Sequence, residues 1–473
     1  MEERFLGRER ELEILKRLLT KKSASLVVIK GRRRIGKSRL IEEFGKSLKT
    51  YTFVGLPPEK KMTAQMQRTE FSRQIERELQ IPGLQAKDWG DLFWHLSHHV
   101  QQGRVLIVFD EINWMGSKDP TFLGKLKTAW DQSFKKNPEL IMILCGSMSS
   151  WIERNIINST GFLGRTSLNL TLQELPLSVC NLFWHPRENL VSSYEKCKIL
   201  SVIGGVPKYL EEIHPEWTAE ENIKTLCFEK ESFLFKEFTH IFSDLFSKRS
   251  NTYKQIIERL AEGPADQQDI GKALNMKKGG TIGSYLEDLV ITGYVSQDYT
   301  WNLMTATPSK FSRYRLKDNY LRFYLKVIEP NTHKILEDET VKPLGWDAIM
   351  GLQFENLVLN NRSAIKKRLS LTSDDILFDN PFFKNPSKQH KGCQIDYLIQ
   401  TKYNSLHLCE IKFSKGKIGM DVVKEVQEKI LRLGSEKKFS IWPVLIHVNG
   451  VTDELQNSGF FSRIIDFGEL LVF

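Results

Sequence analysis

A glycine-framed turn between an apolar run and a helical run constrains this chain more than any other feature. Every fixed position of the pattern G-x-x-x-x-G-K-[ST] is met by Gly31, Arg32, Arg33, Arg34, Ile35, Gly36, Lys37 and Ser38. The glycines let the backbone curl so that its N–H groups point at phosphate oxygens, and the following helix adds the positive end of its dipole. Residues 25–30 indicate a buried strand and residues 37–46 a helix. We therefore predict that this turn and the adjacent Arg39 bind ATP. Lys37 would hold the β- and γ-phosphates, and the Ser38 hydroxyl would ligate Mg²⁺.

An apolar run that ends in two carboxylates supplies the second half of such a site. Residues 105–109 indicate a buried strand, and Asp110 and Glu111 follow it directly. Charge at the end of a buried strand is costly unless the chemistry needs it. We predict that Asp110 orients the water shell of the metal ion and that Glu111 activates the attacking water as a general base. A solvated acidic turn is the alternative interpretation.

Two further polar residues are candidates for the same chemistry. Ser147 follows a strand expected at 140–145, where it would either sense the γ-phosphate or cap the next helix. Arg165 would either stabilise charge that develops during phosphoryl transfer or be an ordinary surface arginine. Whether Arg165 would act within its own subunit or across an interface stays open.

Strand-like and helical runs alternate over residues 1–175, which predicts an α/β fold with a mostly parallel sheet covered on both faces. Helical segments dominate residues 176–245. Residues 246–330 indicate three helices and a hairpin, the order of a winged helix-turn-helix. Its third helix, expected at 281–291, would be the recognition helix. Residues 331–473 begin with a polar linker, followed by a helix and several strands.

Two of these last strands place charged side chains on one face. Side chains alternate along a strand, so Glu410 and Lys412 share a face with the apolar residues before them. If this strand pairs antiparallel with the one that holds Asp396, the Asp396 and Glu410 carboxylates can converge on one cation, beside Lys412. The alternative is a half-exposed strand whose charges are solvated or paired across strands.

Composition limits the classes of partner and compartment. Lys plus Arg number 68 and Asp plus Glu 58, a net charge of +10 that favours a polyanionic partner such as DNA without locating a site. No run of about 18 apolar residues exists, so we expect no membrane span. The N-terminus lacks the apolar core of a signal peptide, and the six cysteines form no C-x-x-C pair. Both features predict a cytoplasmic protein.

Four stretches together resemble the archaeal-type ATPases, which belong to the signal-transducing (STAND) branch of the AAA+-like P-loop NTPases of the ASCE class. They are Phe5-Leu6-Gly7-Arg8-Glu9, the glycine-framed turn, Asp110-Glu111 and Gly204-Gly205-Val206-Pro207. The resemblance implies that Gly7 and Arg8 lie near the adenine and that Pro207, in a helical lid, closes on the nucleotide. It also implies that a winged helix and a nuclease-like domain of undefined function follow the ATPase.

The C-terminal strands resemble those of the PD-(D/E)xK nuclease superfamily, which has a restriction-endonuclease-like fold. Asp396, Glu410 and Lys412 match the motif, Glu355 matches the extra acidic residue of the preceding helix, and Ile395 departs from the proline. The resemblance implies that Asp396 and Glu410 hold Mg²⁺ and that Lys412 assists the nucleophilic water.

Together these features predict an Mg²⁺-dependent ATPase whose nucleotide state controls a winged helix and a nuclease-like domain that acts on DNA. A signalling switch of the STAND type is the alternative, in which the nuclease-like domain is inactive and binds a partner. In that case a homo-oligomer that depends on nucleotide is expected. A sequence-specific DNA-binding regulator is a third reading.

Overall fold

The computed structural model describes residues 5–57, 59, 61–81, 84, 87–116, 118–147, 149–246, 250–276, 281–341, 345–384, 386, 392–434 and 438–472. The chain divides into two compact units. The first comprises Met1–Leu175 with His240–Ser250, and the second Pro176–Thr239 with Asn251–Phe473. No helix in the described ranges combines the length and the apolar character that a membrane crossing requires.

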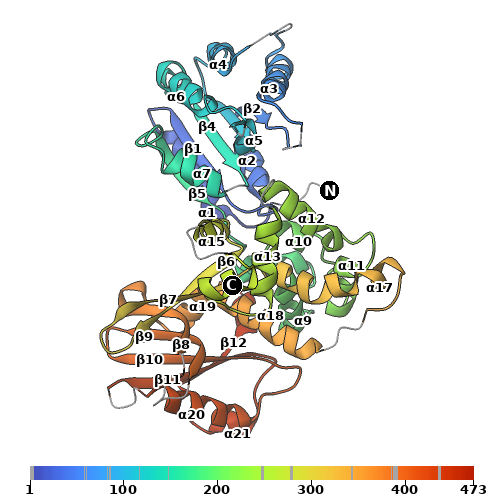
Figure 1. Cartoon of the computed structure of the whole chain (residues 1–473), viewed down its shortest axis with the longest axis vertical. Coiled ribbons are helices and arrows are strands. Elements are labelled where there is room, and N and C mark those ends of the chain that lie inside the picture. Colours follow the sequence, from blue (N-terminus) through green and yellow to red (C-terminus); the bar gives the residue numbers. More distant parts are fainter. Residues whose placement is uncertain are drawn as a thin grey trace. The chain divides into compact units, whose positions relative to one another are not determined.

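A five-stranded parallel sheet forms the centre of the first unit, in the order β2-β3-β4-β1-β5 (Figure 1). Its strands are β1 Ser25–Lys30, β2 Lys49–Val54, β3 Val105–Asp110, β4 Ile141–Gly146 and β5 Thr166–Thr171. The predicted parallel α/β sheet is therefore confirmed. Because β4 lies between β1 and β3, the two strands that lead into the predicted nucleotide-binding residues are not neighbours, but their carboxyl ends meet at the same edge.

Alternating side chains explain why helices cover both faces of this sheet. Along β1, Leu26 and Val28 enter one apolar core, whereas Val27 and Ile29 enter the other. Helices α3 to α6 contribute to the first core, and α1 and α2 to the second. The helices of this unit are α1 Glu9–Lys16, α2 Lys37–Gly45, α3 Ala64–Leu79, α4 Trp89–His98, α5 Ile112–Gly116, α6 Phe122–Gln132 and α7 Ser149–Ile152.

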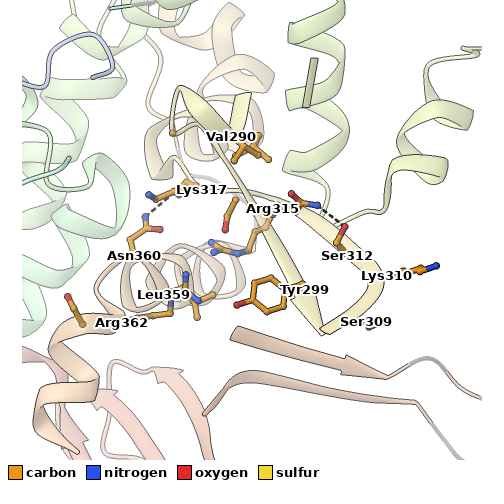
Figure 2. Close-up of a pocket in the computed structure, with 15 residues that line it drawn as sticks. Val290, Tyr299, Ser309, Lys310, Ser312, Arg315, Lys317, Leu359, Asn360 and Arg362 are labelled. Atoms are coloured by element: carbon orange, nitrogen blue, oxygen red, sulfur yellow. Dashed lines mark hydrogen bonds between the residues drawn. The ribbon is translucent and has the colours of Figure 1, made fainter. Parts of the chain in front are cut away.

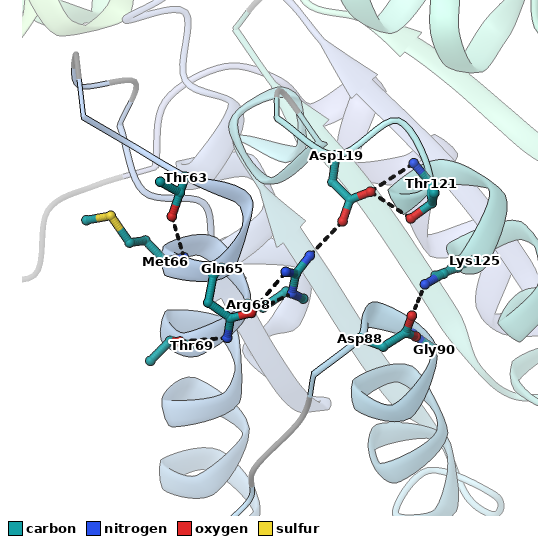
Figure 3. Close-up of polar contacts among 10 residues, drawn as sticks. All are labelled: Thr63, Gln65, Met66, Arg68, Thr69, Asp88, Gly90, Asp119, Thr121 and Lys125. Atoms are coloured by element: carbon teal, nitrogen blue, oxygen red, sulfur yellow. Dashed lines mark hydrogen bonds and ion pairs between the residues drawn. The ribbon is translucent and has the colours of Figure 1, made fainter.

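Charged side chains connect the helices that cover the first core (Figure 3). Thr63 caps α3, and Asp88 caps α4 while it also pairs with Lys125 of α6. Arg68 of α3 forms an ion pair of 2.7 Å with Asp119, which precedes α6. Both pairs are partly buried, and they link these helix ends to one another.

The second unit begins with helices and then forms a hairpin. Its elements up to residue 336 are α8 Leu177–Asn181, α9 Ser193–Ile203, α10 Pro207–Leu210, α11 Ala219–Cys227, α12 Phe233–Phe246, α13 Ser250–Ala261, α14 Gln267–Ala273, α15 Thr281–Ile291, β6 Val295–Asn302, β7 Thr307–Leu316, α16 Asn319–Phe323 and α17 Thr332–Leu336. Helix α12 runs across the boundary between the two units. From α13 to β7 the chain forms three helices and an antiparallel hairpin in the order expected. Residues 277–280, which precede the third helix, lie outside the described residues.

One stretch that the sequence predicted as a linker is helical. Helix α17 occupies part of that stretch, and its Ile335 is completely buried. The polar residues around Ile335 concealed a short helix, because one apolar anchor gives no periodic signal.

A five-stranded mixed sheet completes the second unit, in the order β12-β11-β10-β9-β8. Its strands are β8 Ile376–Lys384, β9 Cys393–Thr401, β10 Ser405–Phe413, β11 Ser440–Val448 and β12 Arg463–Asp466, and its helices are α18 Trp346–Asn360, α19 Arg362–Arg368, α20 Asp421–Leu433 and α21 Asp453–Asn457. Strand β9 is antiparallel to β8 and β10, whereas β10, β11 and β12 are parallel, with α20 as the crossover between β10 and β11. Trp301 of β6 is buried in the core of this sheet, stacked on Phe378 of β8. The hairpin and the sheet thus share one core.

Candidate functional site

The predicted phosphate-binding turn follows the carboxyl end of β1, and α2 begins at Lys37. Gly36 has a φ of 88°, which favours glycine, and it precedes the first residue of the helix. A Cβ atom on Gly31 would lie 2.8 Å from the carbonyl oxygen of Leu172 and 3.1 Å from a methyl carbon of Ile35. The two glycines of the motif are thus required by backbone conformation at one position and by close packing at the other.

Lys37 is held inside this turn. Its side chain is buried, and its ammonium donates to the carbonyl oxygens of Gly31 at 3.0 Å and Arg32 at 3.1 Å. Both acceptors are uncharged, so an arriving phosphate would offer the ammonium a stronger partner. The position of Lys37 is therefore suited to a phosphate group bound in the turn.

Ser38 and Asp110 lie together although their strands are not adjacent. The Ser38 hydroxyl donates to Asp110 Oδ2 at 3.0 Å, and Asp110 Oδ1 accepts from the backbone N–H of Glu111 at 3.0 Å. A hydroxyl and a carboxylate are ligand types that suit Mg²⁺, which normally keeps several water ligands. These two residues fit the metal ion that the sequence implied.

Glu111 is fixed in place by Ser147. Glu111 Oε2 accepts from the Ser147 backbone N–H at 3.2 Å and from its hydroxyl at 3.0 Å. With the Asn113 amide oriented so that its oxygen accepts from the indole N–H of Trp114, its nitrogen donates to Glu111 Oε2 at 3.3 Å. Burial raises the pKa of Glu111, while the charge of Lys37 opposes the shift. A carboxylate with a raised pKa is a better proton acceptor, as a general base requires.

The sequence predicted that Ser147 either senses the γ-phosphate or caps a helix, and neither prediction included its contact with Glu111. It is buried at the end of β4, and its hydroxyl bonds to Glu111. The contact of Asn113 with Glu111 was also not predicted from the sequence. The available signal was a polar residue two positions after Glu111, in the otherwise apolar helix α5.

The N-terminal segment lies beside the turn. Arg8 is buried, and its guanidinium donates to the carbonyl oxygen of Ile35 at 3.0 Å and to that of Gln173. Gly7 and Arg8 both have positive φ values, 74° and 66°. The adenine contact that the resemblance implies for them stays a prediction.

The remaining residues of the turn have different roles in packing. Ile35 is buried in the core that α1 and α2 cover, and this packing fixes the position of the turn. Arg32 is buried and forms an ion pair of 2.8 Å with Glu174, and Arg39 lies 3.9 Å from Glu42 on α2. Arg33 and Arg34 also have partners within the chain. Phosphate contacts by these four arginines stay predictions. Pro207 begins α10 in the second unit, and its closure over the nucleotide stays a prediction too.

Arg165 lies far from the turn within its own unit. It precedes β5, whose Thr166 pairs with Leu26 near the start of β1, whereas the turn follows Lys30 at the other end. Five residues of strand separate the two edges by about 16 Å. The guanidinium forms a bidentate pair with Asp131 on α6, with Nη2 2.8 Å from Oδ2. A catalytic role within this unit therefore does not fit, and only a role across an interface stays open.

We expect Arg165→Ala to leave ATP turnover unchanged in a sample that is monomeric. The bond from Arg165 holds the pKa of Asp131 well below its usual value, so the pair stabilises the fold above the unfolded pKa of about 4 and loses this effect as pH falls. The difference in melting temperature between wild type and variant should thus be small near neutral pH and vanish in acid. A large fall in turnover of the monomer would contradict this placement.

The C-terminal carboxylates converge as predicted. Strands β9 and β10 pair antiparallel, with Leu408 opposite Leu398. The ammonium of Lys429 lies 3.1 Å from Asp396 Oδ1 and 2.6 Å from Glu410 Oε2. Lys412 lies 3.1 Å from Glu410 Oε1 and 2.5 Å from Glu425. The cation on which Asp396 and Glu410 meet is therefore the ammonium of Lys429.

Lys429 was not foreseen from the sequence. It lies on α20, seven residues after Val422 and three after Val426, both of which are buried in the core of the sheet. Burial lowers the pKa of Lys429, but the carboxylates of Asp396 and Glu410 outweigh this effect and raise it overall. A lysine on the apolar stripe of an amphipathic helix was the signal for a buried carboxylate partner.

Asp396 and Glu410 can hold a metal ion only under one condition. The described residues contain no group of three or more His, Cys, Asp or Glu side chains placed to hold a metal ion. Asp396 and Glu410 offer suitable oxygens, but Lys429 pairs with both carboxylates and Lys412 pairs with that of Glu410. A divalent ion fits between them only if this ammonium withdraws.

Glu355 of α18 contributes a third carboxyl group nearby. Burial and the charge of Asp396 raise its pKa, Arg315, Arg322 and Lys429 oppose the shift, and the net pKa is about 7. Glu355 is therefore partly protonated near neutral pH. That state reduces repulsion in the carboxylate cluster.

Glu355 makes stability depend on pH. Its folded pKa of about 7 lies above the ordinary value of 4.5, so its contribution is fully present below pH 4.5 and is lost as pH rises through 7. We expect the melting temperature of wild type to fall more between pH 5 and pH 8 than that of Glu355→Gln. Parallel curves for the two proteins would contradict this assignment.

Comparisons with known proteins support the reading of the first unit. Residues 5–213 match the family described as an ATPase domain predominantly from Archaea. A relative from Methanocaldococcus jannaschii, the uncharacterized protein MJECL04, is 25% identical over 402 residues, which is 83% of this chain and 84% of the relative.

Several solved structures are similar to parts of the chain. The Walker-type ATPase PABY2304 of Pyrococcus abyssi is 16% identical, with a TM-score of 0.49, over 68% of this chain and 96% of its own. The ORC2 protein of Aeropyrum pernix is 17% identical, with a TM-score of 0.42, over 72% of this chain and 97% of its own.

The family match covers the turn, the paired carboxylates and Ser147, which are the residues that the fold brings to one edge of the parallel sheet. Residues 5–213 therefore carry an ATPase domain of the archaeal type.

Proposed function

We propose that this protein hydrolyses ATP with Mg²⁺ at the edge of the parallel sheet formed by the carboxyl ends of β1, β3 and β4. The observation that carries the proposal is the contact between Ser38 and Asp110, beside a buried Lys37 and a Glu111 that Ser147 positions. These groups come from three separate strand ends. Their meeting at one edge is what phosphoryl transfer requires.

Each of these residues has one step in the proposed reaction. The N–H groups of the turn and the Lys37 ammonium bind the phosphate oxygens, and Ser38 and Asp110 hold Mg²⁺, which neutralises charge on the phosphates. Glu111 accepts the proton of the attacking water, while Ser147 fixes the orientation of the carboxylate. The rate of phosphoryl transfer then depends on how well the water and the γ-phosphate are positioned, because the protein forms no covalent bond with the phosphoryl group.

Metal removal tests this proposal. We expect phosphate release from ATP to stop when EDTA is added and to return with Mg²⁺ or Mn²⁺. Ser38→Ala should raise the Mg²⁺ concentration needed for half-maximal turnover, since one of the two protein ligands is lost. Thr20→Ala, which removes another short hydroxyl from an exposed position near a helix end, is the control. Full turnover in EDTA would rule the proposal out.

We further propose that residues 246–330 form a winged helix and that residues 331–473 form a nuclease-like domain that acts on DNA. The crossover helix α20, the antiparallel β9–β10 pair and the convergence of Asp396 and Glu410 support the nuclease-like reading. Incubation of supercoiled plasmid with the protein, Mg²⁺ or Mn²⁺, and with or without ATP, tests it. Cleavage that Glu410→Ala abolishes would support it, and intact plasmid in every condition would overturn it.

The contact made by Lys429 favours a second candidate function. Because Lys429 already lies between Asp396 and Glu410 and pairs with both, the C-terminal domain can be a folded partner-binding module without nuclease activity. ATP would then switch the protein between two states, as in the signalling alternative. Light scattering with no nucleotide, ADP and a non-hydrolysable ATP analogue tests this: a change in oligomer size is expected. Identical size and shape in all three states would exclude it.

A further inference from the structure

A polar cleft opens between the β6–β7 hairpin and the helices α18 and α19 (Figure 2). Its volume is about 720 Å³, and all of its lining residues belong to the second unit. Lys317 and Arg362 lie at one end and Lys310 at the other, with Tyr299 between them (Figure 2). None of the residues that line the cleft belongs to the proposed ATP site.

The lining of the cleft carries positive charge. It includes Lys310, Lys317, Arg315 and Arg362, and no Asp or Glu is among the described residues that line it. Arg315 is buried and neutralised by Asp298, with its Nε 2.8 Å from Oδ2, so this pair forms a neutral floor. The charge available to a ligand therefore comes from the ends of the cleft.

Arg362 and Lys310, at the two ends of the cleft, form no ion pair with a carboxylate in the described part of the chain. Arg362 donates to the backbone oxygen of Asp379 at 3.0 Å and to the amide oxygen of Asn380 at 3.1 Å, neither of which carries a charge. Lys310 is exposed, and within the described part of the chain no carboxylate lies at ion-pair distance from it. The Ser312 hydroxyl, which accepts a bond from Gln297, and the second N–H of the Asn360 amide add hydrogen-bond donors. Such a surface suits phosphate groups.

An aromatic ring lies exposed between the two ends. Tyr299 is 37% exposed and lines the cleft, and its ring meets Phe378 edge-on with centroids 6.4 Å apart. Edge-on packing on one side fixes the ring and leaves a face for a ligand. A positively charged groove with an exposed aromatic ring is the combination that proteins use for single-stranded nucleic acids, because phosphates follow the charges and a base stacks on the ring.

We propose that this cleft binds single-stranded DNA, with phosphates at Lys310, Lys317 and Arg362 and a base stacked on Tyr299. The inference rests on the proposed action on DNA but not on ATP hydrolysis. Arg315 donates to the amide oxygen of Asn356 on α18, and the charges of both Arg315 and Asp396 act on the pKa of the adjacent Glu355. The floor of the cleft therefore lies next to the C-terminal carboxylates. A strand held here would therefore lead toward Asp396 and Glu410.

Binding of a fluorescein-labelled dT oligonucleotide, measured by anisotropy at several salt concentrations, tests the proposal. Tyr299→Ala should weaken binding by about fivefold or more with the salt dependence unchanged, and Tyr299→Phe should restore it, because stacking needs the ring and not the hydroxyl. Lys310→Gln and Lys317→Gln should each lower the slope of log affinity against log salt by about 0.7, the value for one phosphate on a single strand.

Matched controls separate this cleft from general electrostatics. Lys22→Gln makes the same charge change on an exposed lysine of the first unit, and Tyr403→Ala removes a ring that is 65% exposed outside the cleft. Both should bind the oligonucleotide as wild type does, and ATP turnover should be unchanged in all variants. Cleft variants that bind as wild type would overturn this inference and leave the proposed function standing. Absence of DNA binding by a wild type that hydrolyses ATP would overturn both the inference and the proposed action on DNA.

Discussion

Glu111→Gln is expected to lower kcat for ATP hydrolysis by about 10²- to 10⁴-fold, the range that general-base catalysis supplies. Glutamine keeps the shape of the side chain and can still accept the bonds from Ser147, which are 3.2 and 3.0 Å long in the wild type. It cannot take a proton from water. Binding of ATP should therefore persist while turnover is lost, because Lys37, Ser38 and Asp110 are untouched.

Phosphate release and binding of a fluorescent ATP analogue, measured on the same sample, check this result. Glu139→Gln is the matched control, since Glu139 is exposed and pairs with Arg104 at 3.4 Å. In wild type, turnover should be lost as pH falls through a pKa above 4.5, because burial raises the pKa of Glu111 and a protonated base is inactive. A variant that turns over ATP at the wild-type rate would remove Glu111 from the reaction.

The nucleotide-binding turn could be predicted from the sequence because its requirements are local. The strand before it, the glycines within it and the helix after it are contiguous, so one pattern specifies all of them. The partnership of Ser38 with Asp110 also followed, because parallel strands bring their carboxyl ends to one edge. The bond from Ser147 to Glu111 did not follow, since side-chain orientation at a strand end depends on φ, which is 48° at Glu111.

Residues that depend on register or on tertiary packing could not be placed. The position of Arg165 needed the pairing of Thr166 with Leu26, which puts it at the opposite edge from the turn. Lys429 needed the packing of α20 against β9, because the sequence separates it from Asp396 by 33 residues. Both residues are charged, and their partners lie on other helices or strands. The spacing of residues along the sequence does not predict such distant partners.

Lys37→Ala is expected to lower turnover by about 10²- to 10³-fold, the cost of removing one preorganised donor from developing charge. It should also weaken ATP binding, in contrast to Glu111→Gln, because the ammonium contacts phosphate in the ground state as well as in the transition state. The wild type should therefore gain thermal stability with Mg²⁺ and ATP, by RT ln(1 + [L]/Kd), and the variant should gain much less at the same concentration.

Stability of the variant without nucleotide must be measured first, because Lys37 also bonds to the carbonyl oxygens of Gly31 at 3.0 Å and Arg32 at 3.1 Å. Loss of both bonds removes one donor from each acceptor, at a cost of about 1–3 kcal/mol for each that neither water nor another group replaces. Lys46→Ala is the control, since Lys46 directly follows the same helix, is exposed and pairs with Glu43. If Lys37→Ala folds, binds ATP and hydrolyses it as the control does, the turn is a structural connection between β1 and α2. The pair of Ser38 and Asp110 would then be a hydrogen bond that joins the start of α2 to the end of β3, and its resemblance to a metal site would have no catalytic meaning.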